Sequence, residues 1–404
     1  MTRLVHTGDT HLGYGQYHLP ERREDFQAAF EQVLEDAVAE DVDAVVHAGD
    51  LFHDRQPSLS DVLGAVSALE RLNAAGIPFL AVVGNHESKR DAQWLDLFET
   101  MGLATRLGPD PTTVGDVAVY GLDFVPRAQR EDLTYAFEPH DADTAVLVSH
   151  GLFEPFAHGD WDVREILRAS PVAFDAVLLG DDHEPGTKRL EEPHDVWLTY
   201  CGSTERASAA ETEPRGYNIV QFEDGVDIRR KGLETRDFVF VDVDLGESEG
   251  SDRVREQVGQ HDLTDAVVIV KIRGDGEPVM PATIEAFATD RGALTARVTD
   301  EREQPEDGEI EVSFADPDEA VRERVGDLGL SRAARDLDET IRASTVADSN
   351  VADVAATRVA ELVEEGNASA FQPAADSDGA DSTPQADRDA AGSDEGQVSM
   401  EDYL

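Results

Sequence analysis

Five short segments of the chain combine histidine, aspartate and asparagine in a way that could bind metal ions. They are Asp9-Thr10-His11, Gly49-Asp50-Leu51-Phe52-His53, Gly84-Asn85-His86-Glu87, Ser149-His150-Gly151 and Gly180-Asp181-Asp182-His183. Mixed carboxylate, amide and imidazole ligands suit manganese, iron or zinc. The residue types therefore predict a metal site.

Each segment directly follows an apolar run that is typical of a β-strand. The runs are Arg3 to Thr7, Ala44 to Val46, Phe79 to Val83, Thr144 to Val148 and Ala176 to Leu179. Open α/β sheets build their sites at the carboxyl ends of strands, and glycines let the backbone turn tightly there. A lone His or Asp at such an end is more often a capping or turn residue. Five together favour a metal site.

The first 233 residues alternate strand-like runs with helical patterns, which predicts an α/β domain. Helical spacing is present in Phe26, Phe30, Val33 and Leu34 and again from Leu63 to Leu72, and further strands are predicted at Val117 to Tyr120 and Val196 to Tyr200. The expected fold is a four-layer sandwich of two mixed sheets flanked by helices.

Three further regions are predicted after residue 233. Residues 234–315 form a small α/β domain, with strands at Phe238 to Leu245 and Val267 to Ile272 and part of a helix at Ile284 to Phe287. Residues 316–366 carry two amphipathic helical segments that have too little chain for a core, so we expect them to dock on a partner. Residues 367–404 are rich in Ala, Asp, Ser, Gly and Pro, which predicts a disordered acidic tail.

The composition is strongly acidic, with 86 Asp and Glu against 34 Lys and Arg and a formal charge of -52. Acidic residues are spread along the whole chain, and only four of the basic residues are lysines. This distribution is typical of salt-loving archaea, where high internal salt screens the self-repulsion, and the alternative is an acidic protein of an ordinary cytoplasm.

The single cysteine, Cys201, allows no intrachain disulfide and no thiolate zinc cage. We find neither a signal-peptide pattern near the N-terminus nor a run of apolar residues long enough to span a membrane. The expected location is the cytoplasm, in association with the nucleoid.

In their order along the chain, the five segments resemble the metal-binding motifs of the calcineurin-like metallophosphoesterases. The resemblance covers about the first 230 residues. It implies that one metal is held by Asp9, His11, Asp50 and His183, and that Asp50 bridges to a second metal completed by Asn85, His150 and Asp181. It also implies that His86 faces the phosphate and protonates or stabilises the leaving oxygen; the alternative is a structural histidine behind the ligands.

Position 181 departs from the family pattern, which runs Gly-His-x-His where this chain has Gly180-Asp181-Asp182-His183. An aspartate can still ligate, but it adds negative charge and shifts the preference toward harder cations such as manganese or magnesium. The alternative is a weakened second site.

The stretch from Asp9 to Phe26, with Gly49 to Arg55, Gly84 to Glu87 and Gly202 to Arg206, is similar to the SbcD-type (Mre-eleven family) repair nuclease subunits. This resemblance implies two Mn²⁺ ions, 3′ to 5′ double-strand exonuclease and single-strand endonuclease activity on DNA ends, and a homodimer. It further implies that residues 234–315 form a capping domain and that residues 316–366 bind a coiled-coil, SMC-like ATPase in a heterotetramer.

The same resemblance makes His18, Arg55 and Arg90 candidates for DNA phosphate contacts, against ordinary surface residues. It makes His53 an active-site residue that shapes the DNA end, against a structural role. Separately, Gln397, Met400, Tyr403 and Leu404 fit the spacing of a sliding-clamp-binding peptide, against a merely apolar terminus.

Two other functions stay open beside the nuclease. One is a scaffold that tethers DNA ends and the ATPase with little or no catalysis, which the aspartate at position 181 and the acidic surface would suit. The other is a phosphodiesterase that acts on small nucleotides.

Overall fold

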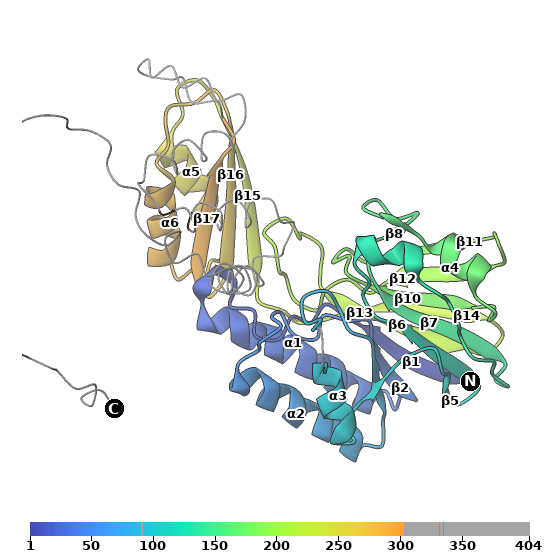
Figure 1. Ribbon diagram of the computed structural model, residues 1–404. Helices are drawn as coiled ribbons and strands as arrows, with labels where there is room; N and C mark the ends of the chain where they lie inside the picture. Colours follow the sequence, from blue (N-terminus) through green and yellow to red (C-terminus); the bar gives the residue numbers. More distant parts are fainter. Residues whose placement is uncertain (90–91, 303–330, 332–333, 335–404) are drawn as a thin grey trace, which may run out of the picture. The chain divides into compact units, whose positions relative to one another are not determined.

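The computed structural model of the protein describes residues 1–89, 92–302, 331 and 334, and two six-stranded sheets dominate its first 232 residues (Figure 1). In sheet order, the first comprises β14 (Val226–Gly232), β13 (Gly216–Phe222), β1 (Thr2–Thr7), β2 (Ala44–His47), β3 (Phe79–Ala81) and β4 (Thr105–Arg106). Strands β1 to β4 run parallel, whereas β13 is antiparallel to both β1 and β14.

The second sheet has the same mixed character. Its order is β11 (Gly186–Leu190), β12 (Val196–Tyr200), β10 (Ala176–Gly180), β7 (Thr144–His150), β6 (Val117–Leu122) and β5 (Thr112–Val114). The four central strands are parallel and the two edge strands antiparallel. Short strands β8 (Phe153–Glu154) and β9 (Trp161–Asp162) form a separate pair.

Four α-helices belong to this part of the chain: α1 (Pro20–Ala39), α2 (Leu59–Ala74), α3 (Trp94–Thr100) and α4 (Val163–Ala169). Helix α1 begins with a proline, whose fixed φ suits the first helical position. Helix α2 begins at a capping box, in which the Ser58 hydroxyl accepts from the Asp61 N–H and the Asp61 carboxylate accepts from the Ser58 N–H. Two 3₁₀ segments, Gln16–His18 and Arg127–Asp132, lie in loops.

Alternating side chains of the strands supply separate hydrophobic cores on the two faces of each sheet. In β1, Val5 packs with residues of α1, α2 and α3, whereas Leu4 joins the core between the two sheets. In β7, Leu147 packs on the α4 side, whereas Val148 faces the first sheet. The resulting order of layers is helices, sheet, sheet and helix.

A third sheet follows, with its own hydrophobic core. It contains β15 (Phe238–Leu245), β16 (Val267–Gly274) and β17 (Thr295–Asp300), all parallel, with helices α5 (Ser251–Val258) and α6 (Pro281–Asp290) as the crossovers. Parallel neighbours require such crossover connections, which explains the regular alternation of strand and helix here.

The predicted mixed α/β sandwich is therefore confirmed for the described residues. The two strands and the helix expected between residues 234 and 290 are present, whereas the sequence reasoning missed the β13–β14 hairpin and β17. The domain boundaries at 233 and 315 and the capping role stay predictions. Residues 303–315, the helix pair of 316–366 and the tail of 367–404 lie outside the described residues, apart from 331 and 334. No described helix is long and apolar enough to cross a membrane.

Candidate metal centre

The carboxyl ends of five strands bring the predicted ligands together. They are Asp9 and His11 after β1, Asp50 after β2, Asn85 after β3, His150 at the end of β7, and Asp181 and His183 after β10. The ligand atoms of Asp9, His11 and His183 lie within 4.8 Å of one another, and so do those of Asp9, Asp50 and His150. Both sheets contribute because β1 to β3 belong to the first and β7 and β10 to the second.

The interatomic distances divide these side chains into two groups that share Asp50. In one group, His11 Nε2 lies 3.0 Å from His183 Nε2 and 3.9 Å from Asp50 Oδ2. In the other, His150 Nε2 lies 2.9 Å from Asn85 Oδ1, 3.5 Å from Asp50 Oδ2 and 3.7 Å from Asp181 Oδ1. Asp50 thus lies near side chains of both groups, and the bridging role that the resemblance implies for it stays a prediction.

Hydrogen bonds fix which ring nitrogen two of these histidines present. His150 Nδ1 donates to the Ala48 carbonyl at 2.7 Å, and His183 Nδ1 donates to Glu211 Oε1 at 2.8 Å. Since these acceptors can only accept, each neutral ring carries its lone pair on Nε2, the atom that faces the other ligands. This arrangement is the usual one for metal-binding imidazoles.

The charges of the cluster also fit cation binding. Asp9 and Asp50 are buried, and burial is the main reason that the pKa of Asp9 rises to about 6. Burial alone lowers the pKa of His150, but Asp50, Asp181 and Asp9 hold it well above its usual value. Buried carboxylates require positive partners, and a pair of divalent cations would supply them.

Several ligand positions have left-handed backbone conformations without being glycine. The φ values are 49° at Asp9, 45° at His11, 57° at Asp50 and 96° at Asp181. Such conformations cost about 1–3 kcal/mol each and persist where the surroundings impose them, commonly at functional sites. Backbone N–H groups help to fix the carboxylates: His86 donates to Asp50 Oδ1 at 2.9 Å, and Asp181 donates to both oxygens of Asp9 at 3.1 Å.

His86 and His53 stand beside the cluster and beside each other. His86 Nδ1 donates to the His53 carbonyl at 2.9 Å, which leaves Nε2 as the free ring nitrogen. The nitrogen ligand atoms of His11, His53 and His86 form a third group within 4.8 Å. Tyr14 stacks on the His53 ring with a centroid distance of 3.9 Å.

A cavity of about 530 Å³ opens next to these two histidines. Its lining residues are Tyr14, Gly15, Tyr17, His18, His53, His86 and Arg297. The cavity therefore includes His18, one of the candidate DNA contacts, but not Arg55. The Arg55 carbonyl accepts a hydrogen bond from Trp94 Nε1 at 3.1 Å. Arg90 and the proposed clamp-binding residues Gln397, Met400, Tyr403 and Leu404 lie outside the described residues.

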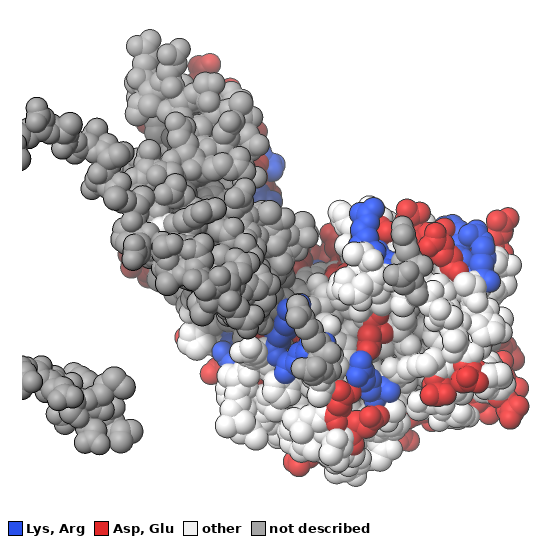
Figure 2. Space-filling model, in the orientation of Figure 1, with Lys and Arg blue, Asp and Glu red and all other residues white. Residues whose placement is uncertain are grey.

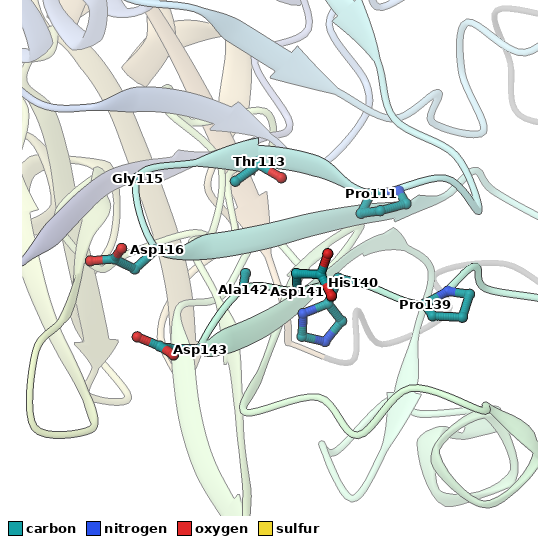
Figure 3. A pocket seen from close by; sticks show the side chains of 9 residues that line it. All are labelled: Pro111, Thr113, Gly115, Asp116, Pro139, His140, Asp141, Ala142 and Asp143. Atoms are coloured by element: carbon teal, nitrogen blue, oxygen red, sulfur yellow. The ribbon is translucent and has the colours of Figure 1, made fainter.

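A larger cavity of about 650 Å³ contains none of the predicted site residues (Figure 3). It is lined by Pro111, Thr113, Gly115, Asp116 and residues 139–143. These residues come from β5, the turn between β5 and β6, and the segment before β7, so this cavity lies away from the ligand-bearing strand ends.

Sequence reasoning missed two carboxylates that support the cluster. Glu87 is buried and accepts from the Phe52 N–H at 3.1 Å, and burial is the main cause that raises its pKa to about 7. Its position directly after His86 was an available signal. Glu211 contacts His183 from 28 residues away, in a loop with no metal-binding pattern, and only the tertiary structure reveals that contact.

Comparison with known proteins identifies first the class and then the family. The calcineurin-like phosphoesterase family matches residues 2–185, which contain all seven predicted ligands. The chain is 63% identical over 366 residues to the "DNA double-strand break repair protein Mre11" of Haloferax volcanii, covering 90% of this chain and 82% of that protein.

Two more proteins of the same name are similar. The one from Halobacterium salinarum is 55% identical over 95% of this chain and 99% of its own length, and the one from Methanosarcina acetivorans is 42% identical over 90% of this chain and 61% of its own. The chain belongs to the Mre11 family of DNA double-strand break repair proteins. The haloarchaeal relatives agree with the prediction drawn from the acidic composition.

Proposed function

We propose that this chain is a manganese-dependent DNA nuclease that processes DNA ends in double-strand break repair. The observation that carries the proposal is the convergence of the seven candidate ligands from both sheets around a shared Asp50, in a chain of the Mre11 family. The proposed activities are 3′ to 5′ exonuclease action on double strands and endonuclease action on single strands.

The two groups of side chains would hold one cation each. Asp9, His11, Asp50 and His183 would bind the first, and Asp50, Asn85, His150 and Asp181 the second. When bound, the pair supplies a water of lowered pKa and positive charge for the phosphate oxygens. The carboxylate at position 181 favours Mn²⁺ over softer ions, because added oxygen ligands suit harder cations.

Within this site, His86 would act on the leaving oxygen. Its Nδ1–H is committed to the His53 carbonyl, so Nε2 is the atom that would carry a proton to the substrate. His53 would shape the path of the DNA end, since its ring packs between His86 and Tyr14. His18 borders the same cavity and would contact the strand near the cleaved bond.

The surface offers a reason for the proposed homodimer. Large apolar side chains are exposed on α2 and at α3: Leu59 is 74% exposed, Leu63 57%, Leu97 41% and Met101 46%. Pairing of these two helices with those of a second copy would remove the apolar surface from water. The coiled-coil ATPase would bind through residues 316–366 and complete a heterotetramer.

Asp181 and the acidic surface favour one alternative, a tether with little catalysis. In Figure 2, small groups of acidic and basic side chains lie next to one another on the face drawn. A tether would bind DNA and its partner with or without metal and would not cleave.

The decisive experiment is cleavage of end-labelled linear and single-stranded DNA with Mn²⁺ in high potassium salt. Wild type is compared with His86→Ala, Asp181→His and a control, His261→Ala, whose histidine is exposed near the third sheet. We expect wild type and the control to cleave, and His86→Ala to lose about 10²–10⁴-fold in rate while it still binds Mn²⁺ and DNA.

Other results would redirect the proposal. Normal cleavage by His86→Ala would remove its role as proton donor. If the wild type does not cleave DNA and Asp181→His does, the result would favour the tether. The aspartate would then have weakened the second metal site.

A further inference from the structure

Glu211 is a buried carboxylate whose two oxygens serve different partners. Among the residues that the structure describes, Oε1 accepts only from His183, a candidate ligand, at 2.8 Å from its Nδ1. Oε2 accepts from the Ala207 N–H at 3.0 Å, from Arg215 Nη1 at 3.2 Å and from the Ser203 hydroxyl at 3.4 Å. The three donors hold the carboxylate in one orientation, which leaves Oε1 directed at the imidazole.

The same loop also fixes the backbone on both sides of this contact. Arg215 Nη1 donates to the His183 carbonyl at 3.1 Å, and Arg206 Nε donates to the Glu211 carbonyl at 3.1 Å. Arg215 is itself 1% exposed, so its guanidinium group interacts with groups inside the protein and not with solvent. The imidazole of His183 is therefore supported through its ring and through its main chain by a single ionic cluster.

His150, a candidate ligand of the second cation, is supported differently. His150 donates to a neutral main-chain carbonyl, that of Ala48, whereas His183 donates to a carboxylate. A carboxylate partner raises the basicity of a ligating imidazole and fixes its tautomer, and loss of such partners typically costs about 10–100-fold in metal affinity or activity. The difference predicts an effect confined to one of the two cation positions.

We propose that Glu211 is a positioning residue for the first metal site. Its carboxylate holds His183 as the Nδ1–H tautomer and strengthens His183 Nε2 as a ligand. The inference rests on the proposed two-metal function and adds a residue to it. The alternative is that Glu211 serves only as the ionic partner of Arg215 in folding.

The test is Mn²⁺ binding by the metal-free full-length chain in high potassium salt, measured as free Mn²⁺ by electron paramagnetic resonance. The variant is Glu211→Gln, which keeps the shape. Since Ala207 N–H and Arg215 can only donate, the amide oxygen will turn to them and the amide nitrogen will face His183. That nitrogen donates to Nδ1, which favours the Nε2–H tautomer of the ring and weakens Nε2 as a ligand.

Glu205→Gln is the matched control. Glu205 is also buried, lies in the same loop and pairs with a buried arginine, Arg22 at 3.2 Å, but has no contact with a predicted ligand among the contacts described. Both variants lose one buried charge beside an arginine. We expect Glu211→Gln to bind one of two Mn²⁺ about 10–100-fold more weakly and the other unchanged, and Glu205→Gln to bind both like wild type.

Glu211→Asp provides a second variant if the glutamine variant does not fold. It keeps the charge for Arg215 but withdraws the carboxylate from His183, and the proposal again requires weaker binding at one position. Wild-type affinity at both positions in a folded Glu211 variant would overturn the proposal, and so would equal losses in the Glu205 control. A wild type that binds two Mn²⁺ but cleaves no DNA would refute the nuclease proposal and leave this comparison valid.

Discussion

At the scale of single residues, the candidate site depends on backbone conformations that few residue types tolerate. Asp9, His11 and Asp50 have positive φ, and their side chains bear the candidate ligand atoms. Close backbone approach is a second requirement. Gly84 lies so near Asp50 that a Cβ built on it would stand 2.0 Å from Asp50 Oδ1 and 2.2 Å from the Asp50 nitrogen.

The close approach at Gly84 leads to a prediction. Gly84→Ala must displace Asp50, the carboxylate shared by both ligand groups, and we expect cleavage to fall by about 100-fold or more, because ångström-scale misplacement can cost that much. Mn²⁺ binding and DNA cleavage are measured together. Gly108→Ala serves as the control, since its added Cβ would meet no atom within 4 Å. Full activity in Gly84→Ala would show that Asp50 does not need its present position.

At the scale of elements, α2 and α3 each have one face buried in the core and another face that exposes apolar side chains. Their buried faces, which include Leu69 and Phe98, pack on the first sheet in the core that also holds Val5. Their other faces leave Leu59 and Leu63 of α2 and Leu97 of α3 exposed, although a large apolar side chain contributes about 1.5–3 kcal/mol when it is buried. This uncovered surface is the basis of the proposed dimer.

Replacement of Leu63 should therefore shift the oligomeric state. We expect Leu63→Asp to weaken the proposed homodimer by at least about 10–100-fold in Kd, since it removes apolar contact and adds a like charge from each copy to the proposed interface. Sedimentation equilibrium in high potassium salt measures the mass. Val38→Asp, at an exposed apolar position of α1, should stay dimeric. A dimer of undiminished affinity in Leu63→Asp would exclude this face of α2 from the interface.

At the scale of the whole molecule, one buried histidine joins the two large sheets. His6 lies on β1 of the first sheet, and its Nε2 donates to the Leu179 carbonyl on β10 of the second at 3.2 Å. Burial is the main cause that lowers the pKa of His6 from its ordinary 6.5 to about 3. The folded state therefore keeps this ring neutral at pH values where the unfolded chain takes up a proton.

The sign of the pH effect follows from that difference. The unfolded chain binds the extra proton below pH 6.5, so the contribution of His6 to stability is full above pH 6.5 and is lost as the pH falls toward 3. At pH 5.5 the loss is about 1.4 kcal/mol. Denaturant unfolding of wild type and His6→Gln at constant salt measures it, and the two curves should converge by that amount between pH 8 and 5.5.

A control separates this effect from the titration of the many carboxylates. His261→Gln replaces an exposed histidine and should keep the wild-type pH dependence. Parallel curves for wild type and His6→Gln would contradict the assigned shift. The formal charge of -52 contributes equally to these proteins, because each differs from wild type at a single histidine.

The sequence by itself determined which residue types are the candidate ligands and which strands carry them. Five apolar runs predicted strands, and the polar segments after them predicted a site at their carboxyl ends, because strand ends of one sheet meet at one edge. The single departure from the family motif, Asp181, was also visible, and its oxygen lies 3.7 Å from His150 Nε2. Local pattern suffices for such features, since each depends on residues a few positions apart.

The tertiary structure decided what distant residues do together. It placed Glu211 against His183, left α2 with an uncovered apolar face, and paired β13 with β1 across more than two hundred residues. It also showed that several candidate ligand positions adopt left-handed backbone conformations, which the residue types alone do not predict. These features arise from long-range packing, whose strength depends on which surfaces meet, and no local spacing in the sequence encodes that.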